Sequence, residues 1–401
     1  MILVELALVI KKIFPYFFSG IFALLLISCN DSPTDLGKNF VDPLDGVGIA
    51  SFDSSVDSMN QTSKPIKNVF SLGTSARLLL GKAENVEALT MLQFSFSLAD
   101  SIKEQINNGE IVVLDSWIDI IKEYRFGDSS AAFDYTVHKI TNSWSPSTFT
   151  ADSLSLLQYE NVDVSSQRNT ENDTTYSFHL NTDVTKLWLE DYADTGTVTN
   201  YGILLEPVGN TQKILGFTAF NSSGEDQALL TFVINKPGIY TDTVFATLLY
   251  DISVVKGDYA IVGSENIPIQ ASLASEAHIT FDLNVLPENI TINSASLTLT
   301  VDTLLTKVGS PYINKLLVFL VADSTKDSVD SDYYAELSRS GATFTGNISN
   351  IVRAWNNGVD NQGIIVKAYS EYYGVETFVI RGSNAAVQSE RPKLKLVYSR
   401  K

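Results

Sequence analysis

The stretch Leu297-Thr298-Leu299-Thr300-Val301-Asp302 decides the fold class of this chain. Its apolar residues alternate with polar ones, so an extended strand would have one apolar face and one polar face. The runs 133–138 and 277–283 alternate in the same way. Strands rich in Val, Ile, Thr, Phe and Tyr, separated by Asn, Gly, Ser and Asp, are typical of half-buried antiparallel sheets. We therefore predict an all-β fold made of β-sandwiches.

Only a few short helices are expected. Ser101 and Glu104 have the spacing of a capping box, which predicts a short helix that ends near Gly109. Two further helices are predicted from apolar residues at helical spacing, namely Val184, Leu187 and Trp188, and Ile348, Ile351, Val352 and Trp355. The two tryptophans on these helices, and Trp144, are therefore predicted to be structural residues of the core.

Each of the last two helices begins a similar order of segments, which indicates an internal repeat. The segments after the helix are residues 200–205, 216–220 and 228–233 in the first copy, and residues 361–366, 377–380 and 392–398 in the second. The turn-forming stretch Asn235-Lys236-Pro237-Gly238 lies between the copies. We therefore predict two tandem sandwich domains, over residues 46–236 and 237–401.

The N-terminal residues indicate export. Two lysines precede the apolar run 13–27, and the run is followed by Ser28, Cys29 and an abrupt change to polar residues. This order predicts a signal peptide over residues 1–28, and Pro15, Ser19 and Gly20 argue against a permanent membrane helix. Leu26-Ile27-Ser28-Cys29 resembles the lipobox of bacterial lipoproteins, which implies that Cys29 carries lipid. Residues 29–45 are polar and are predicted to form a flexible tether.

Charge and cysteine content restrict the class of protein further. The chain has a formal net charge of −18, which disfavours binding to nucleic acid. Cys29 is the only cysteine, so disulfides within the chain and cysteine metal sites are excluded. We expect the protein to be attached to a membrane through lipid on Cys29. We predict a location in the cell envelope, at the outer membrane.

The repeat resembles a known family. A short helix with Trp, then Asn-x-Gly and two apolar residues, an aromatic strand and Pro392-Lys393-Leu394-Lys395-Leu396-Val397-Tyr398 resemble the DNRLRE domain. Ile292–Leu299 resembles an early strand of that domain, and Ile140–Trp144 with Thr148–Thr150 resembles its Trp-containing stretch. The resemblance covers about residues 75–235 and 255–401. It implies jelly-roll-like sandwiches related to carbohydrate-binding modules of surface proteins. Residues 35–127 also resemble uncharacterised lipoproteins of gliding-type bacteria.

The sequence contains no recognisable catalytic constellation. The three histidines, His138, His179 and His278, lie on different segments, and strand alternation predicts that they face solvent. No His-x-x-x-His, Gly-x-Ser-x-Gly or phosphate-binding glycine loop occurs. Carboxylates are abundant, but no two of them are marked as a glycosidase pair. We therefore predict that the protein is not an enzyme.

Two clusters are candidate ligand sites. Tyr369, Tyr372 and Tyr373, with Glu371 between them, are predicted to lie in a turn, where the flat rings could pack against a sugar. The alternative for these tyrosines is packing between sheets. A loop with four aspartates could hold a structural calcium ion, or could simply be solvated: Asp323, Asp327, Asp330 and Asp332. No other cofactor is expected.

The resemblance favours one function among three. We expect a non-catalytic, membrane-anchored lipoprotein that binds polysaccharide or mediates adhesion through its sandwiches. The first alternative is a structural spacer that binds another envelope protein. The second alternative is a glycan-active enzyme, which is disfavoured because no acid and base pair stands out.

Overall fold

The computed structural model describes residues 48–169, 174–195, 200–222, 227–258, 260 and 262–400. The predicted signal peptide, Cys29 and the predicted tether lie outside the described residues. Residues 50–398 form one compact unit. Within the described ranges, no helix has the length and apolar character needed to cross a membrane.

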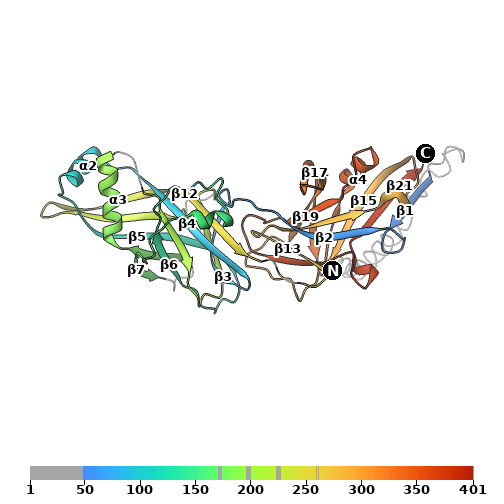
Figure 1. Ribbon diagram of the computed structural model, residues 1–401, viewed down its shortest axis with the longest axis horizontal. Coiled ribbons are helices and arrows are strands. Elements are labelled where there is room, and N and C mark those ends of the chain that lie inside the picture. Colours follow the sequence, from blue (N-terminus) through green and yellow to red (C-terminus); the bar gives the residue numbers. More distant parts are fainter. Residues whose placement is uncertain are drawn as a thin grey trace, which may run out of the picture. The chain divides into compact units, whose positions relative to one another are not determined.

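The strands form two sheets, and the fold is all-β as predicted (Figure 1). We call the sheet of ten strands, with its helices, the first sandwich. Its strands are β3 (Arg77–Ala83), β4 (Val86–Phe96), β5 (Val112–Phe126), β6 (Tyr135–Lys139), β7 (Ser165–Asn169), β8 (Thr175–Leu180), β9 (Ile203–Pro207), β10 (Ile214–Thr218), β11 (Leu229–Lys236) and β12 (Tyr240–Gly257).

We call the sheet of eleven strands, with its helix, the second sandwich. Its strands are β1 (Gly48–Asp53), β2 (Gln61–Lys67), β13 (Asn266–Gln270), β14 (Ser275–Phe281), β15 (Ile290–Thr300), β16 (Lys315–Asp323), β17 (Ser328–Ser340), β18 (Thr343–Asn347), β19 (Ile364–Ala368), β20 (Thr377–Arg381) and β21 (Lys393–Arg400).

Each sheet curls so that its apolar face surrounds a core. In the first sandwich β10 pairs with both β3 and β5, which brings distant strands of the sheet together. In the second, Val301 at the end of β15 forms a bridge with Ile380 of β20. The predicted alternation is confirmed on β15, where Leu297 and Leu299 are fully buried while Thr298 and Thr300 are only half-buried. Alternation places every second side chain in the core.

The three α-helices are α2 (Asp100–Asn107), α3 (Thr182–Thr195) and α4 (Ser349–Asn356), and η1 (Ala151–Leu156), η2 (Leu283–Val285) and η3 (Gln388–Glu390) are short 3₁₀ turns among the described residues. Trp188 and Trp355 are buried in the cores, as predicted, and Trp144 is half-buried. Leu187 is exposed, so its predicted core position is wrong, and the next residue but one, Leu189, is buried instead.

The predicted capping box at Ser101 is also wrong. The residue that caps α2 is Ala99, and its side chain makes no capping hydrogen bond. Ser101 therefore lies inside the first turn of the helix. The predicted end is confirmed, because Gly109 follows α2 with a φ of +69°, a conformation that favours glycine.

The predicted seam between the two copies lies elsewhere in the structure. Asn235 and Lys236 end β11, and Pro237 and Gly238 belong to the turn of a hairpin in which β12 pairs with β11 residue by residue. Proline and glycine mark a tight turn as readily as a domain boundary, so the sequence signal was ambiguous. The first sandwich therefore continues to Gly257, while residues 48–67 pair within the second sandwich.

Candidate functional site

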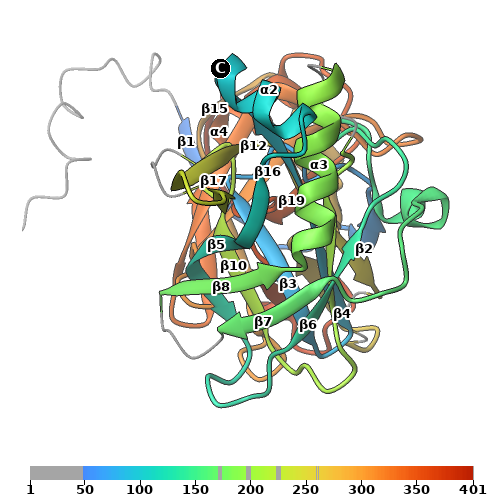
Figure 2. The same ribbon diagram turned by 90° about the vertical axis from the view of Figure 1, so that its left-hand side faces the viewer.

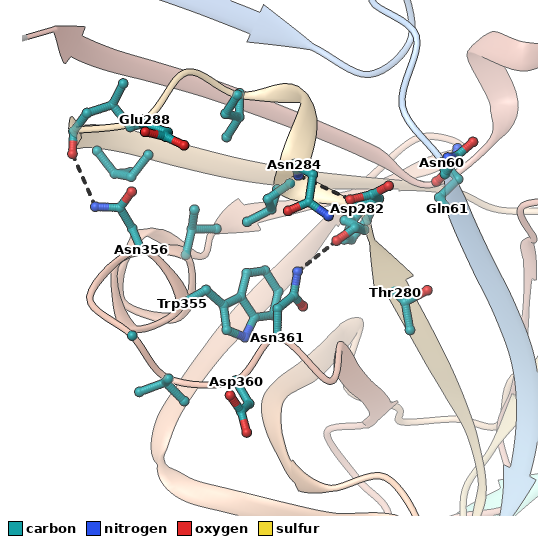
Figure 3. A pocket seen from close by; sticks show the side chains of 18 of the residues that line it. Asn60, Gln61, Thr280, Asp282, Asn284, Glu288, Trp355, Asn356, Asp360 and Asn361 are labelled. Carbon is teal, nitrogen blue, oxygen red and sulfur yellow. Dashed lines mark hydrogen bonds between the residues drawn. The ribbon is translucent and has the colours of Figure 1, made fainter.

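A pocket of about 730 Å³ opens in the second sandwich (Figure 3). It is lined by the beginning of β2, the end of β14, the η2 turn, the beginning of β15 and the end of α4 with the loop that follows. We call it the Trp355 pocket. Three separate stretches of the chain, residues 60–62, 280–292 and 352–361, thus meet at one place.

The lining combines apolar and polar side chains. The apolar part comes from the η2 turn, β15 and α4, and includes Leu283, Leu286, Ile290, Val352, Trp355 and Val359. The polar part consists of amides and carboxylates: Asn60, Gln61, Asp282, Asn284, Glu288, Asn356, Asp360 and Asn361. Figure 3 shows the indole of Trp355 in the midst of these polar groups.

Hydrogen bonds to the backbone hold two of the amides in place (Figure 3). Asn361 donates from Nδ2 to the carbonyl oxygen of Phe281 at 2.8 Å, and Asn356 donates to the carbonyl oxygen of Ile290 at 3.2 Å. On the η2 turn, the backbone N–H of Asn284 donates to Asp282 at 3.1 Å. The polar edge of the pocket is therefore fixed before any ligand arrives, which lowers the entropy cost of binding.

Two buried polar atoms of the lining have no hydrogen-bond partner among the described residues. They are Nε1 of Trp355, whose residue is only 7% exposed, and Oε1 of Gln61. A buried donor or acceptor without a partner costs about 1–3 kcal/mol, so such atoms are rare in folded proteins. The indole N–H can only donate and the amide oxygen can only accept. Both atoms are shielded from solvent, so a ligand hydroxyl group reaches them only if neighbouring side chains move.

The charge of the lining is negative. Asp282, Glu288 and Asp360 bring three carboxyl groups, and none of the described residues that line the pocket is Lys, Arg or His. Electrostatic repulsion at such a site disfavours the binding of anionic ligands, whereas neutral or cationic ligands can bind.

In the first sandwich a helix stands at the place that corresponds to the η2 turn. There the connection after β4 forms α2, whereas the connection after β14 forms only the short η2 turn. Figure 2 shows α2 beside α3, and Asn107 of α2 donates to the carbonyl oxygen of Ala193 at 3.1 Å. Tyr192 of α3 packs against Phe96, with ring centroids 5.8 Å apart. One segment that borders the Trp355 pocket therefore differs between the two copies.

The structure places the predicted tyrosine cluster in the connection between β19 and β20. The carbonyl oxygen of Tyr372 accepts from Ser75 at 2.7 Å, and that of Tyr373 accepts from Arg77 at 2.6 Å. The ring of Tyr372 lies 4.7 Å from that of Phe70. Both tyrosines are half-buried, and so is Tyr369, whose ring has the Lys315 ammonium 5.4 Å from its centroid. This turn is packed against residues 70–77, and a sugar contact here stays a prediction.

Glu371 is buried beside that turn in a small ionic cluster. It pairs with Lys367 at 2.8 Å and hydrogen-bonds to the carboxyl group of Glu276, which also accepts from Asn68 at 2.7 Å. Burial raises the pKa of Glu276 well above its ordinary value, and the negative charge of Glu371 raises it further. Glu276 therefore holds a proton where an exposed glutamate would have lost it.

The four aspartates predicted to form a calcium site lie in the β16–β17 hairpin. Asp323 accepts from Thr325 at 2.6 Å and pairs with Lys326 at 3.1 Å, while Asp330 accepts from the backbone of Asp332 at 3.0 Å. Oδ1 of Asp327 is buried without a partner in the part of the chain that the structure describes. Over the same residues, no group of three or more His, Cys, Asp or Glu side chains could hold a metal ion. Calcium in this hairpin stays a prediction.

The prediction that the histidines face solvent is wrong for two of them. His138 and His278 are each 6% exposed. His138 donates to the carbonyl oxygen of Glu160 at 3.1 Å, and His278 donates to that of Gln362 at 2.8 Å. Loops cover the outer faces of these strands, so alternation alone does not indicate exposure. His179 pairs with Asp115 at 2.8 Å.

Sequence reasoning missed the residues of the Trp355 pocket. One local signal was present, because the polar run Asn356-Asn357-Gly358 and Asp360-Asn361 follows an amphipathic helix directly. The other contributors, residues 60–62 and 280–292, are far away in the chain. Their meeting depends on strand pairings that no local pattern predicts.

Comparison with models of known protein families finds no match for this chain, and comparison with curated proteins finds no similar sequence. The resemblance to the DNRLRE domain therefore depends on the motifs quoted above.

Proposed function

We propose that this protein is a non-catalytic, lipid-anchored lipoprotein of the cell envelope that binds a neutral polysaccharide in the Trp355 pocket. The observation that carries the proposal is Trp355, whose indole N–H is buried without a partner, in a pocket lined by amide and carboxylate groups, of which Asn356 and Asn361 are held by hydrogen bonds to the backbone. The sequence around Cys29 supports the exported, lipid-anchored location.

The chemistry of the pocket suits a sugar. Asp and Asn oxygens accept hydrogen bonds from sugar hydroxyls, and the Trp355 N–H donates to a hydroxyl oxygen. The C–H faces of a sugar ring can pack on the apolar side chains of Leu286 and Val359. Because the described lining carries three carboxylates and no cation, we expect neutral or amino-bearing sugars to bind better than uronic or sulfated ones.

The experiment is affinity electrophoresis and calorimetry with neutral, amino-bearing and acidic polysaccharides. Wild-type protein should be retarded by at least one neutral or amino-bearing polysaccharide. Trp355→Phe keeps an aromatic ring in the core and removes the N–H, so we expect about a tenfold loss of affinity, the magnitude of one hydrogen bond of about 1.4 kcal/mol. Asp360→Asn should bind the same polysaccharide and tolerate acidic ones better.

Trp188→Phe is the matched control, because it makes the same change on α3 of the first sandwich. It should leave affinity unchanged. Equal losses in both tryptophan variants would indicate a general effect on folding and would contradict a site at Trp355. If no polysaccharide binds and another envelope protein co-purifies, the structural-spacer function would be favoured instead. Release of sugar products by the purified protein would overturn the assignment as non-catalytic.

A further inference from the structure

The two sandwiches have matching strand pairings. In the first, β3 pairs with β4 and β10, and β9 lies between β4 and β6. In the second, β13 pairs with β14 and β20, and β19 lies between β14 and β16. Likewise, β8 lies between β5 and β7 in the first sandwich, and β18 lies between β15 and β17 in the second. One pairing, β16 with β17, has no counterpart among the strands described in the first sandwich.

A pair of glycines fixes the correspondence at single-residue level. Gly202 precedes β9 with a φ of +86°, and a Cβ there would lie 2.0 Å from the carbonyl oxygen of Leu92. Gly363 precedes β19 with a φ of +95°, and its Cβ would lie 2.5 Å from the carbonyl oxygen of Ile279. The next residues pair with the same two positions, Ile203 with Leu92 and Ile364 with Ile279. Leu92 and Ile279 are therefore equivalent, as are Gln93 and Thr280 one residue later.

One strand position in each sandwich is not covered by these correspondences. In the first, β12 fills it, since the beginning of β12 pairs with β11 and the rest pairs with β4. In the second, the equivalent partners are β21 and β14. There β1 lies next to β21 and β2 pairs with β14. The segment β1–β2 thus does in the second sandwich what β12 does in the first.

The position of these strands along the chain does not match the sandwich in which each of them pairs. The segment β1–β2 directly precedes the strands of the first sandwich, but it pairs in the second. β12 directly precedes the remaining strands of the second sandwich, but it pairs in the first. The connections that follow them, residues 68–76 and 258–265, are of similar length. We infer that β1–β2 and β12 are the leading strands of the two repeats and have been exchanged between the sandwiches within one chain.

The exchanged strands are part of the cores that they join. Phe52 of β1 is buried in the core of the second sandwich, and Ala246 and Leu248 of β12 are buried in the core of the first. Each sandwich is therefore completed by strands that precede the other repeat in the sequence. A repeat and its own leading strand do not form a sandwich together.

Cysteine pairs test the exchange in the full chain, in a Cys29→Ser background that has no other thiol. Thr62 and Thr280 are register partners with hydroxyl oxygens 2.7 Å apart, so Thr62→Cys with Thr280→Cys should form a disulfide under mild oxidation. Thr62→Cys with Gln93→Cys is the matched pair for an unexchanged arrangement and should stay reduced. Peptide mass spectrometry of the monomer separates the two outcomes. A disulfide in the second pair, or one that forms only between two chains, would overturn the inference.

A second measurement does not depend on disulfide geometry. A specific protease site placed in the turn after Pro237 cuts the folded protein between β11 and β12. The two fragments should migrate together in gel filtration and separate only in denaturant, because each holds a core strand of the other's sandwich. Fragments that separate in native buffer would contradict the exchange. Loss of polysaccharide binding alone leaves this result unaffected, so the inference and the proposed function fail independently.

Discussion

The hydroxyl groups of Thr62 and Thr280 lie 2.7 Å apart, although 218 residues separate them along the chain. They join β2 to β14 in the second sandwich. Long-range pairing of this kind makes the stability of the second sandwich depend on residues that precede the first. The following predictions use this dependence and the other local features described above.

Phe52→Ala should destabilise the second sandwich. Phe52 is 8% exposed and belongs to the core that contains Trp355, and truncating a buried phenylalanine costs about 3–5 kcal/mol. Trp355 is the tryptophan of the second sandwich, so denaturant unfolding followed through its fluorescence, in a variant that lacks the other three tryptophans, reports on this core. Val56→Ala, at a site that is 80% exposed, is the control and should change little. A Phe52 variant as stable as the control would contradict the assignment of β1 to this core.

Gly363→Ala should destabilise the protein by about 2–4 kcal/mol, because it combines a left-handed φ with a steric clash. A methyl group there would meet the carbonyl oxygen of Ile279 at 2.5 Å. Gly202→Ala should behave alike, since its position is equivalent. Gly209→Ala is the control, because nothing lies within 4 Å of its Cβ position. Chemical denaturation measures all three, and similar stabilities for Gly363→Ala and Gly209→Ala would refute the prediction.

Stability should fall as the pH rises from 5 to 8, and Glu276→Gln should reduce that fall. Burial, and then the charge of Glu371, raise the pKa of Glu276 in the folded state. The unfolded chain therefore loses this proton at a lower pH than the folded protein, and the folded state loses stability over the interval between the two pKa values. The slope from one such group is at most about 1.4 kcal/mol per pH unit.

Glutamine is neutral at every pH and keeps an oxygen that can accept from Asn68. Burial also raises the pKa of Asp251, to about 6, so some pH dependence remains in the variant. Glu84→Gln, at an exposed residue, is the control. Thermal unfolding across this pH range measures the effect, and identical slopes for Glu276→Gln and the wild type would contradict it.

Cys29→Ala should abolish lipid attachment in a bacterial host. The thiol is the acceptor that the lipobox resemblance implies, and no other cysteine can replace it. Incorporation of labelled fatty acid measures the effect, and the variant should leave the membrane fraction. Ser28→Ala keeps a small residue before the cysteine and should still be labelled. Labelled fatty acid on the Cys29 variant would count against the anchor.

The sequence predicts the class of fold well, because alternation over strands such as β15 is a local property. It also predicts the burial of Trp188 and Trp355 and the repeat order of helix, glycine and strands. The strand exchange is not predictable in this way, because the residues around Pro237 are typical both of a hairpin turn and of a domain boundary. Burial of His138 and His278 depends on loops that cover the sheets from outside.

The residues that form the Trp355 pocket are also not predictable from local sequence. Asn361 is visible in the sequence as a loop residue, but Gln61, which lines the same pocket, lies three hundred residues earlier along the chain, on the exchanged strand. The aromatic cluster at Tyr372 is conspicuous locally, and in the structure the ring of Tyr372 packs against Phe70. Local composition thus indicates which side chains are suited to a sugar, while pairing decides which of them meet.

The crossed order of strands has a consequence for biosynthesis. Residues 48–67 leave the ribosome early, yet their partners are made much later: β14 follows the whole first sandwich, and β21 is the last strand of the second. The nascent chain therefore carries an unpaired, half-apolar strand during most of its synthesis. Such segments are prone to aggregation, so we expect the chain to need chaperone protection until β1 and β2 have paired with β21 and β14.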